Sequence, residues 1–110
     1  MKKNEQLKIN IRVEEIVDTI SGEMWADNIE HLGQLRTCNA HVYKVGKNYL
    51  LKSYSTWVAA IFEEETVPVF IDFLRYTFGY TNTSAQHIAK FKHDYWGETV
   101  GDELTWRAIK

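Results

Sequence analysis

Cysteine, proline and glycine are scarce in this sequence, and each scarcity excludes a class of structure. Cys38 is the only cysteine among 110 residues, which excludes an internal disulfide and a cysteine-rich metal site. The six glycines are scattered singly, so no glycine-rich loop exists to bind a phosphate group. No run approaches the ~20 apolar residues of a membrane helix. We therefore expect one domain of a cytoplasmic protein in a reducing compartment, with no cofactor and no membrane partner.

Charge is segregated along the chain, although the net charge is only −2. Residues 13–30 contain six acids and no base, whereas residues 31–62 contain four bases and no acid. Segregation of this kind predicts two surfaces of opposite sign.

The apolar spacing at the N-terminal end predicts one strand followed by two helices. Residues 7–13 alternate apolar and polar, which is the period of a half-buried strand. Residues 13–20 then follow the helical period, and Gly22 is expected to end that helix. Ser21 can cap a second helix that runs to Gly33. Both helices would present an acidic outer face formed by Glu14, Asp18, Glu23, Asp27 and Glu30.

From Ala40 onward the residue pattern is typical of strands. AHVYKV and YLLKSY flank Gly-Lys-Asn, a pattern typical of a hairpin, and WVAAIF follows as another strand. VPVFIDF also alternates, although residues 67–78 fit a helix as well, and we favour the strand. The predicted fold is α+β: an antiparallel meander of about four strands, two N-terminal helices and one capped C-terminal helix.

GYTNTSAQHIAKF, residues 79–91, combines hydroxyls with an imidazole and so raises the question of a nucleophile and its base. Thr83 and Gln86 have the spacing of a capping box, and a helical apolar stripe follows up to Gly97. No third residue is placed to orient the base. The motif is therefore predicted to start a helix, and the four histidines lack metal-site spacing. We expect no metal and no enzymatic activity.

Two surfaces remain as candidates for binding. The acidic helix face could imitate a phosphate backbone and occupy a basic cleft on a partner protein. Alternatively, bases interleaved with aromatics could bind a single-stranded nucleic acid, because aromatic rings stack on bases while lysines neutralise phosphates. The second set consists of Arg36, Lys44, Lys47, Lys52 and Tyr54.

YLLKSYSTWVAAIF and the later YTNTSAQHIAKF resemble motifs of an uncharacterised small-domain family from phages and conjugative elements of Gram-positive bacteria. The likeness covers about residues 49–91, and the longer PVFIDFLRYTF between the motifs departs from the family pattern. The resemblance implies a mobile genetic element inside a bacterial host and implies no catalytic activity.

Small acidic proteins of such elements often inhibit host defence, so the resemblance leads to an expected function. We expect an anti-CRISPR protein that binds a type II RNA-guided nuclease or its guide-RNA complex, with the acidic face as its binding surface. The alternative is a single-stranded nucleic-acid-binding accessory protein of the phage or conjugative element.

Overall fold

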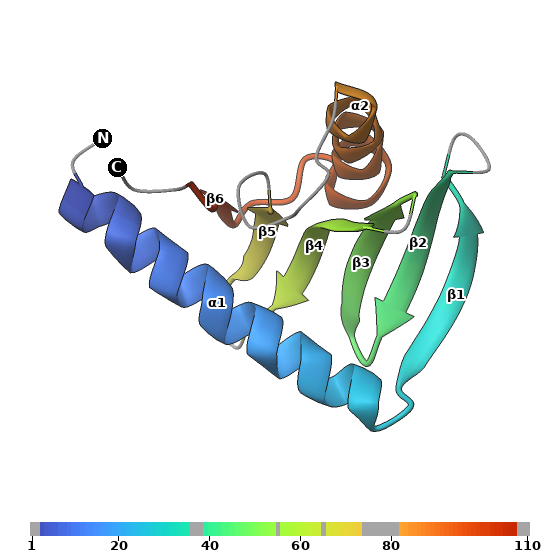
Figure 1. The fold of residues 1–110 in the computed structure, drawn as a ribbon, viewed down its shortest axis with the longest axis horizontal. Coiled ribbons are helices and arrows are strands. Elements are labelled where there is room, and N and C mark those ends of the chain that lie inside the picture. Colours follow the sequence, from blue (N-terminus) through green and yellow to red (C-terminus); the bar gives the residue numbers. More distant parts are fainter. Residues whose placement is uncertain (1–2, 36–38, 55, 65, 74–81, 108–110) are drawn as a thin grey trace.

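The computed structural model describes residues 3–35, 39–54, 56–64, 66–73 and 82–107, and within them it shows one long helix, a curved sheet and a short helix (Figure 1). In chain order the elements are α1 (Lys3–Trp25), β1 (Ile29–Gln34), β2 (Ala40–Val45), β3 (Asn48–Ser53), β4 (Thr56–Glu63), β5 (Pro68–Asp72), α2 (Asn82–Phe91), a π-helical turn (Lys92–Trp96) and β6 (Asp102–Thr105).

The strands lie in the sheet in their order along the chain, from β1 to β6. Neighbours from β1 to β5 are antiparallel, and β6 runs parallel to β5. The helices cover opposite faces of the sheet (Figure 1). On one face Val13, Ile16 and Ile20 of α1 pack into a core, and on the other Ile88 and Phe91 of α2 do so.

The α+β class is as predicted, but the predicted arrangement of two N-terminal helices and four antiparallel strands is wrong. Residues 7–13 are helical and belong to α1, which continues without a break through Gly22. Gly22 is exposed and remains helical, at a cost of about 1 kcal/mol relative to alanine. The described sheet has six strands and is mixed, because the short β6 pairs with β5 in parallel.

Two buried amides explain why the start of α1 does not read as a helix in the sequence. Gln6 and Asn10 occupy the buried face of α1, where apolar residues would normally mark a helix. Asn10 Nδ2 donates to the carbonyl oxygen of Arg107 at 2.6 Å, and the Arg107 N–H donates to Asn10 Oδ1 at 3.1 Å. Gln6 Nε2 donates both to Asn10 Oδ1 and to the carbonyl oxygen of Thr105. These amides hold α1 against the chain beyond β6.

Arg12 provides a second attachment of α1 to the far end of the sheet. Its guanidinium donates to Glu64 at 3.2 Å and to Asp102 at 3.0 Å. Partial burial opposes the charge, but the two carboxylates outweigh it, so the pKa of Arg12 is raised.

In place of the predicted second helix, α1 continues to Trp25, and a tight turn then leads into edge strand β1. Asp27 adopts a left-handed conformation with φ of 61°, which ends the helical path two residues after Trp25. The carbonyl of Asn28 then accepts a hydrogen bond from Gly46 N–H in the β2–β3 turn. The helix-like spacing of Ile29 and Leu32 is coincidental, because pairing with β2 supplies the backbone partners and both side chains remain partly exposed.

The hairpin predicted over residues 40–54 is formed by β2 and β3, and residues 68–72 form β5 rather than a helix. α2 begins at Asn82, so Thr83 lies inside the helix and is not its N-cap as predicted. Gly97 follows the π-helical turn with φ of 55°, and its N–H donates to the carbonyl of Lys92. Neither α1 nor α2 is long and apolar enough to cross a membrane.

Candidate functional site

The hydroxyl–imidazole motif forms a buried cluster that joins α2 to β3. Ser53 Oγ lies 2.8 Å from His87 Nδ1 and 3.1 Å from Ser84 Oγ. All three side chains are almost completely buried, with exposures of 1–2%. A substrate would have no access to these groups, and a buried polar group needs such partners. The cluster therefore fixes the position of α2, and it connects the two motifs that carry the family resemblance.

The five acids predicted to form one helix face are distributed over three elements. Glu14 and Asp18 are exposed on α1, whereas Asp27 lies in the turn and Glu30 on β1. Glu23 points to the opposite side of α1 from Glu14, because nine residues, about two and a half helical turns, separate the two. Its Oε2 accepts a hydrogen bond from Asn48 Nδ2 at 3.4 Å, so the Glu23 side chain lies against the β2–β3 turn.

One exposed side of α1 carries a regular stripe, which we call the outer stripe. Its members are separated alternately by four and three residues, so they project from the same side of the helix. The apolar members are exposed, with fractions of 48% for Leu7, 47% for Ile11 and 88% for Trp25. No hydrogen bond or ion pair of the Glu14 and Asp18 carboxylates is recorded within the described residues. The outer stripe consists of Leu7, Ile11, Glu14, Asp18, Ser21 and Trp25.

The residues predicted to bind nucleic acid do not share a surface. Successive residues of a strand point to opposite faces, so Lys44 projects to the α2 side and Lys52 to the α1 side. Lys47 lies at the β2–β3 turn, and Tyr54 lies at the other end of that hairpin, with its ring 6.2 Å from that of His87. Arg36 lies outside the described residues.

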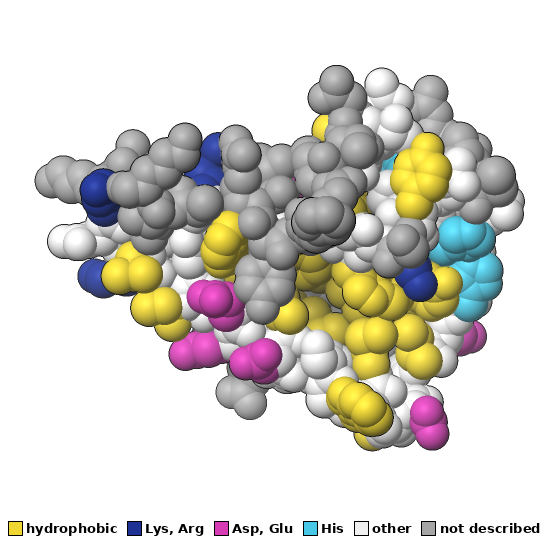
Figure 2. Space-filling model, viewed as in Figure 1, with side chains coloured by type: hydrophobic (Ala, Val, Ile, Leu, Met, Phe, Trp, Pro, Cys, Tyr) yellow, Lys and Arg dark blue, Asp and Glu magenta, His cyan; other side chains and the backbone are white. Residues whose placement is uncertain are grey.

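A cavity of about 360 Å³ opens between the C-terminal end of α1 and the sheet. In Figure 2 hydrophobic side chains gather in this hollow, with acidic side chains along one side. The helix contributes Val17, Ile20, Ser21, Met24 and Trp25, and the turn contributes Asp27. The floor and far side consist of Leu50, Trp57 and Phe73.

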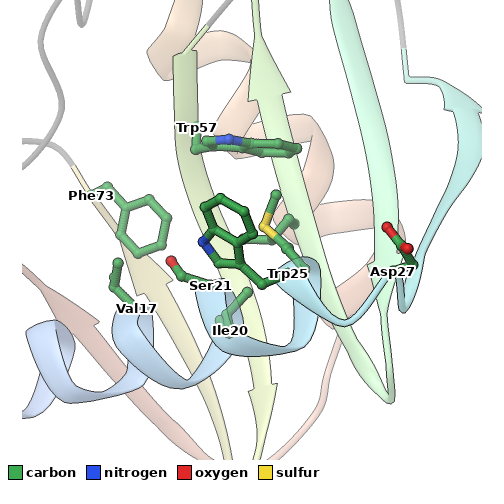
Figure 3. A pocket seen from close by; sticks show the side chains of 9 residues that line it. Val17, Ile20, Ser21, Trp25, Asp27, Trp57 and Phe73 are labelled. Atoms are coloured by element: carbon green, nitrogen blue, oxygen red, sulfur yellow. The ribbon is translucent and has the colours of Figure 1, made fainter.

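The two indoles define the cavity. Trp57 of β4 lies above Trp25 of α1, with Phe73 on one side of the space and Asp27 on the other (Figure 3). Tyr43 packs edge-on against Trp57, with ring centroids 5.1 Å apart, and holds this indole in place. Lys52 Nζ lies over the Trp57 ring at 5.2 Å from its centroid, although Lys52 does not line the cavity. Asp27 is therefore the only charged side chain among the described lining residues.

Other groups capable of chemistry are paired rather than clustered. His31 Nε2 and His41 Nδ1 lie 2.8 Å apart beside Tyr43. Within residues 3–107, leaving out the undescribed positions, no three His, Cys, Asp or Glu side chains are grouped as a metal site requires.

No protein-family model matches the sequence, and comparisons with curated proteins and with solved structures give no match either.

Sequence reasoning missed the cavity and identified only part of the outer stripe. Neither Trp25 nor Trp57 was among the residues predicted to bind a partner. The available signal was the heptad-like recurrence of positions 7, 11, 14, 18 and 25, but the strand interpretation of residues 7–13 concealed it.

Proposed function

We propose that the protein is a non-catalytic binding module that docks the outer stripe of α1 onto a basic surface of a partner protein. The observation that carries the proposal is the composition of the stripe. Two carboxylates without a partner in the described part of the chain, Glu14 and Asp18, lie between apolar residues at both ends, Leu7 and Ile11 on one side and Trp25 on the other. Such a surface matches a partner with basic residues in the middle of an apolar contact.

Trp25 supplies most of the binding free energy in this proposal. A tryptophan side chain buries about 150–250 Å² and is among the most frequent hot-spot residues of interfaces. At about 25 cal/mol per Å², covering the exposed part of Trp25 contributes roughly 3–5 kcal/mol before the costs of association. Glu14 and Asp18 then select the partner and its orientation, because a like-charged surface is repelled.

The partner we propose is the type II RNA-guided nuclease or its guide-RNA complex, which would make the protein an anti-CRISPR inhibitor encoded by a mobile element. Two arguments support this choice: the sequence resemblance to phage and conjugative-element proteins, and the complementarity between the acidic centre of the stripe and a basic nucleic-acid channel. The acidic surface now consists of Glu14 and Asp18, because Glu23 is bound to Asn48 and Asp27 lies at the cavity.

The test is a target-DNA cleavage assay with several purified type II nucleases and increasing amounts of this protein. We expect inhibition near equimolar ratios, and a loss of potency of tenfold or more for Glu14→Lys with Asp18→Lys. The control is Glu30→Lys with Glu98→Lys, which changes the net charge equally at exposed positions away from the stripe. Equal loss in both double variants would show a general charge effect and refute the stripe.

The nucleic-acid alternative has a distinct outcome. If cleavage is unimpaired and the protein retards single-stranded nucleic acid in a salt-sensitive manner, that alternative replaces the inhibitor proposal. Lys44→Glu with Lys47→Glu should then abolish the retardation.

A further inference from the structure

We propose that the cavity between α1 and the sheet binds a small aromatic amine, with the ring between Trp25 and Trp57 and the protonated amine at Asp27. This inference does not depend on the protein partner. The two proposals share Trp25 and Ser21, but the amine binds at Asp27 in the cavity, whereas docking depends on Glu14 and Asp18 of the outer stripe.

The size and lining of the cavity favour a small aromatic molecule. A volume of about 360 Å³ is within the usual range of small-molecule sites. The lining is apolar except for Ser21 and Asp27, and three of its nine side chains are aromatic, Trp25, Trp57 and Phe73 (Figure 3). A flat ring would gain offset-stacked or edge-on contacts with the indoles that a branched aliphatic group could not make.

The charges around the cavity assign the place of each part of the ligand. Lys52 already supplies a cation to the ring of Trp57, so a second cation at this indole would be repelled. The indoles are therefore left for the ring of the ligand. Asp27 lines the cavity, and no partner of its carboxylate is recorded within the described residues. It is the group to which an ammonium would bind.

The experiment compares 2-phenylethylamine with 3-phenylpropionate, two probes of similar shape and opposite charge. Binding is followed by the indole N–H resonances of Trp25 and Trp57, assigned with Trp25→Phe and Trp57→Phe. We expect the amine to shift both resonances and to bind at least threefold more tightly than the carboxylate. If the carboxylate binds as well as the amine, or if the amine shifts neither resonance up to roughly 10 mM, the proposal is overturned.

Two matched variants test the role of Asp27. Asp27→Asn keeps a residue that tolerates φ of 61°, so the turn is preserved while the charge is lost. It should weaken the binding of 2-phenylethylamine about three- to fivefold and should not weaken the binding of 3-phenylpropionate. Asp18→Asn removes an acid that does not line the cavity and should leave the preference for the amine unchanged. Equal effects of the two variants would mean that only the net charge matters, which would overturn the assignment of Asp27.

Trp25→Ala tests the aromatic wall without threatening the core, because this side chain is 88% exposed. We expect a fivefold or greater loss of amine binding, and unchanged binding would overturn the role of the indole. Glu14→Lys with Asp18→Lys should retain amine binding even if it abolishes partner docking, so the two proposals can fail separately.

Discussion

Replacement of Asn10 by alanine should weaken the attachment of the N-terminal part of α1 to the end of the sheet. Three hydrogen bonds are lost: the pair with the Arg107 backbone, at 2.6 and 3.1 Å, and the bond from Gln6 Nε2 at 2.8 Å. At about 1 kcal/mol for each bond, with Arg107 losing both of these partners, the free energy of unfolding should fall by roughly 2–4 kcal/mol. That is a large share of the ~5–15 kcal/mol available to a domain.

Urea unfolding followed by circular dichroism measures this change. With a slope of about 1–3 kcal/mol per molar urea, the midpoint should fall by roughly 1–3 M. Asn4→Ala is the matched control, because Asn4 lies exposed on the same helix and gains the same helix propensity. It should change the unfolding free energy by no more than about 0.5 kcal/mol in the destabilising direction. If Asn10→Ala and Asn4→Ala have the same urea midpoint, the buried amide does not anchor α1 and the reasoning is refuted.

Two further changes probe the β2–β3 turn and the buried cluster. Gly46→Ala should lower the melting temperature by an amount equivalent to about 1–2 kcal/mol, because φ is 61° and the added Cβ would lie 2.5 Å from Glu23 Oε2. Gly22→Ala, with open space around its Cβ in a helix, should instead raise the melting temperature, and the same sign for both would contradict the turn geometry. Ser53→Ala removes the bonds to Ser84 and His87 and should cost about 1–3 kcal/mol in chemical denaturation. Ser21→Ala, at an exposed position, is the control, and an equally small effect at Ser53 would show that the cluster does not hold α2.

The strands that could be predicted from the sequence are those whose pairing is local. β2 and β3 are joined by a two-residue turn, and β5 begins at Pro68, within the segment predicted as a strand. Here the side-chain period and the turn residues both lie within a few positions of the hydrogen bonds that they predict.

The elements that were missed depend on contacts across the whole chain. Gln6 and Asn10 are buried because they bond residues 97–99 positions away, so α1 lacks the apolar period that identifies a helix. β6 is a four-residue strand in which only Leu104 is buried, and its parallel pairing with β5 leaves no local signal. β1 is an edge strand whose side chains are mostly exposed. The apolar spacing of its sequence is therefore indistinguishable from that of an amphipathic helix.

The candidate site residues also differ in whether local sequence spacing or the tertiary fold brings them together. Glu14 and Asp18 could be selected from the sequence, because residues four apart on a helix share a face. The cavity could not, since it needs Trp57 and Phe73 from the sheet placed against the end of α1. The position of Glu23 could not be predicted either, since its partner Asn48 lies 25 residues later in the β2–β3 hairpin.

The attachment of α1 to Thr105 and Arg107 has a consequence for synthesis of the protein on the ribosome. The two buried amides of α1, Gln6 and Asn10, bond backbone groups that are translated 97–99 positions later (Figure 1). Until those residues emerge, the apolar side of α1 can already pack on β2 to β5, but Gln6 and Asn10 lack their backbone partners. The N-terminal part of α1 therefore docks fully only after residue 107 has left the exit tunnel, which delays its protection from proteolysis and aggregation.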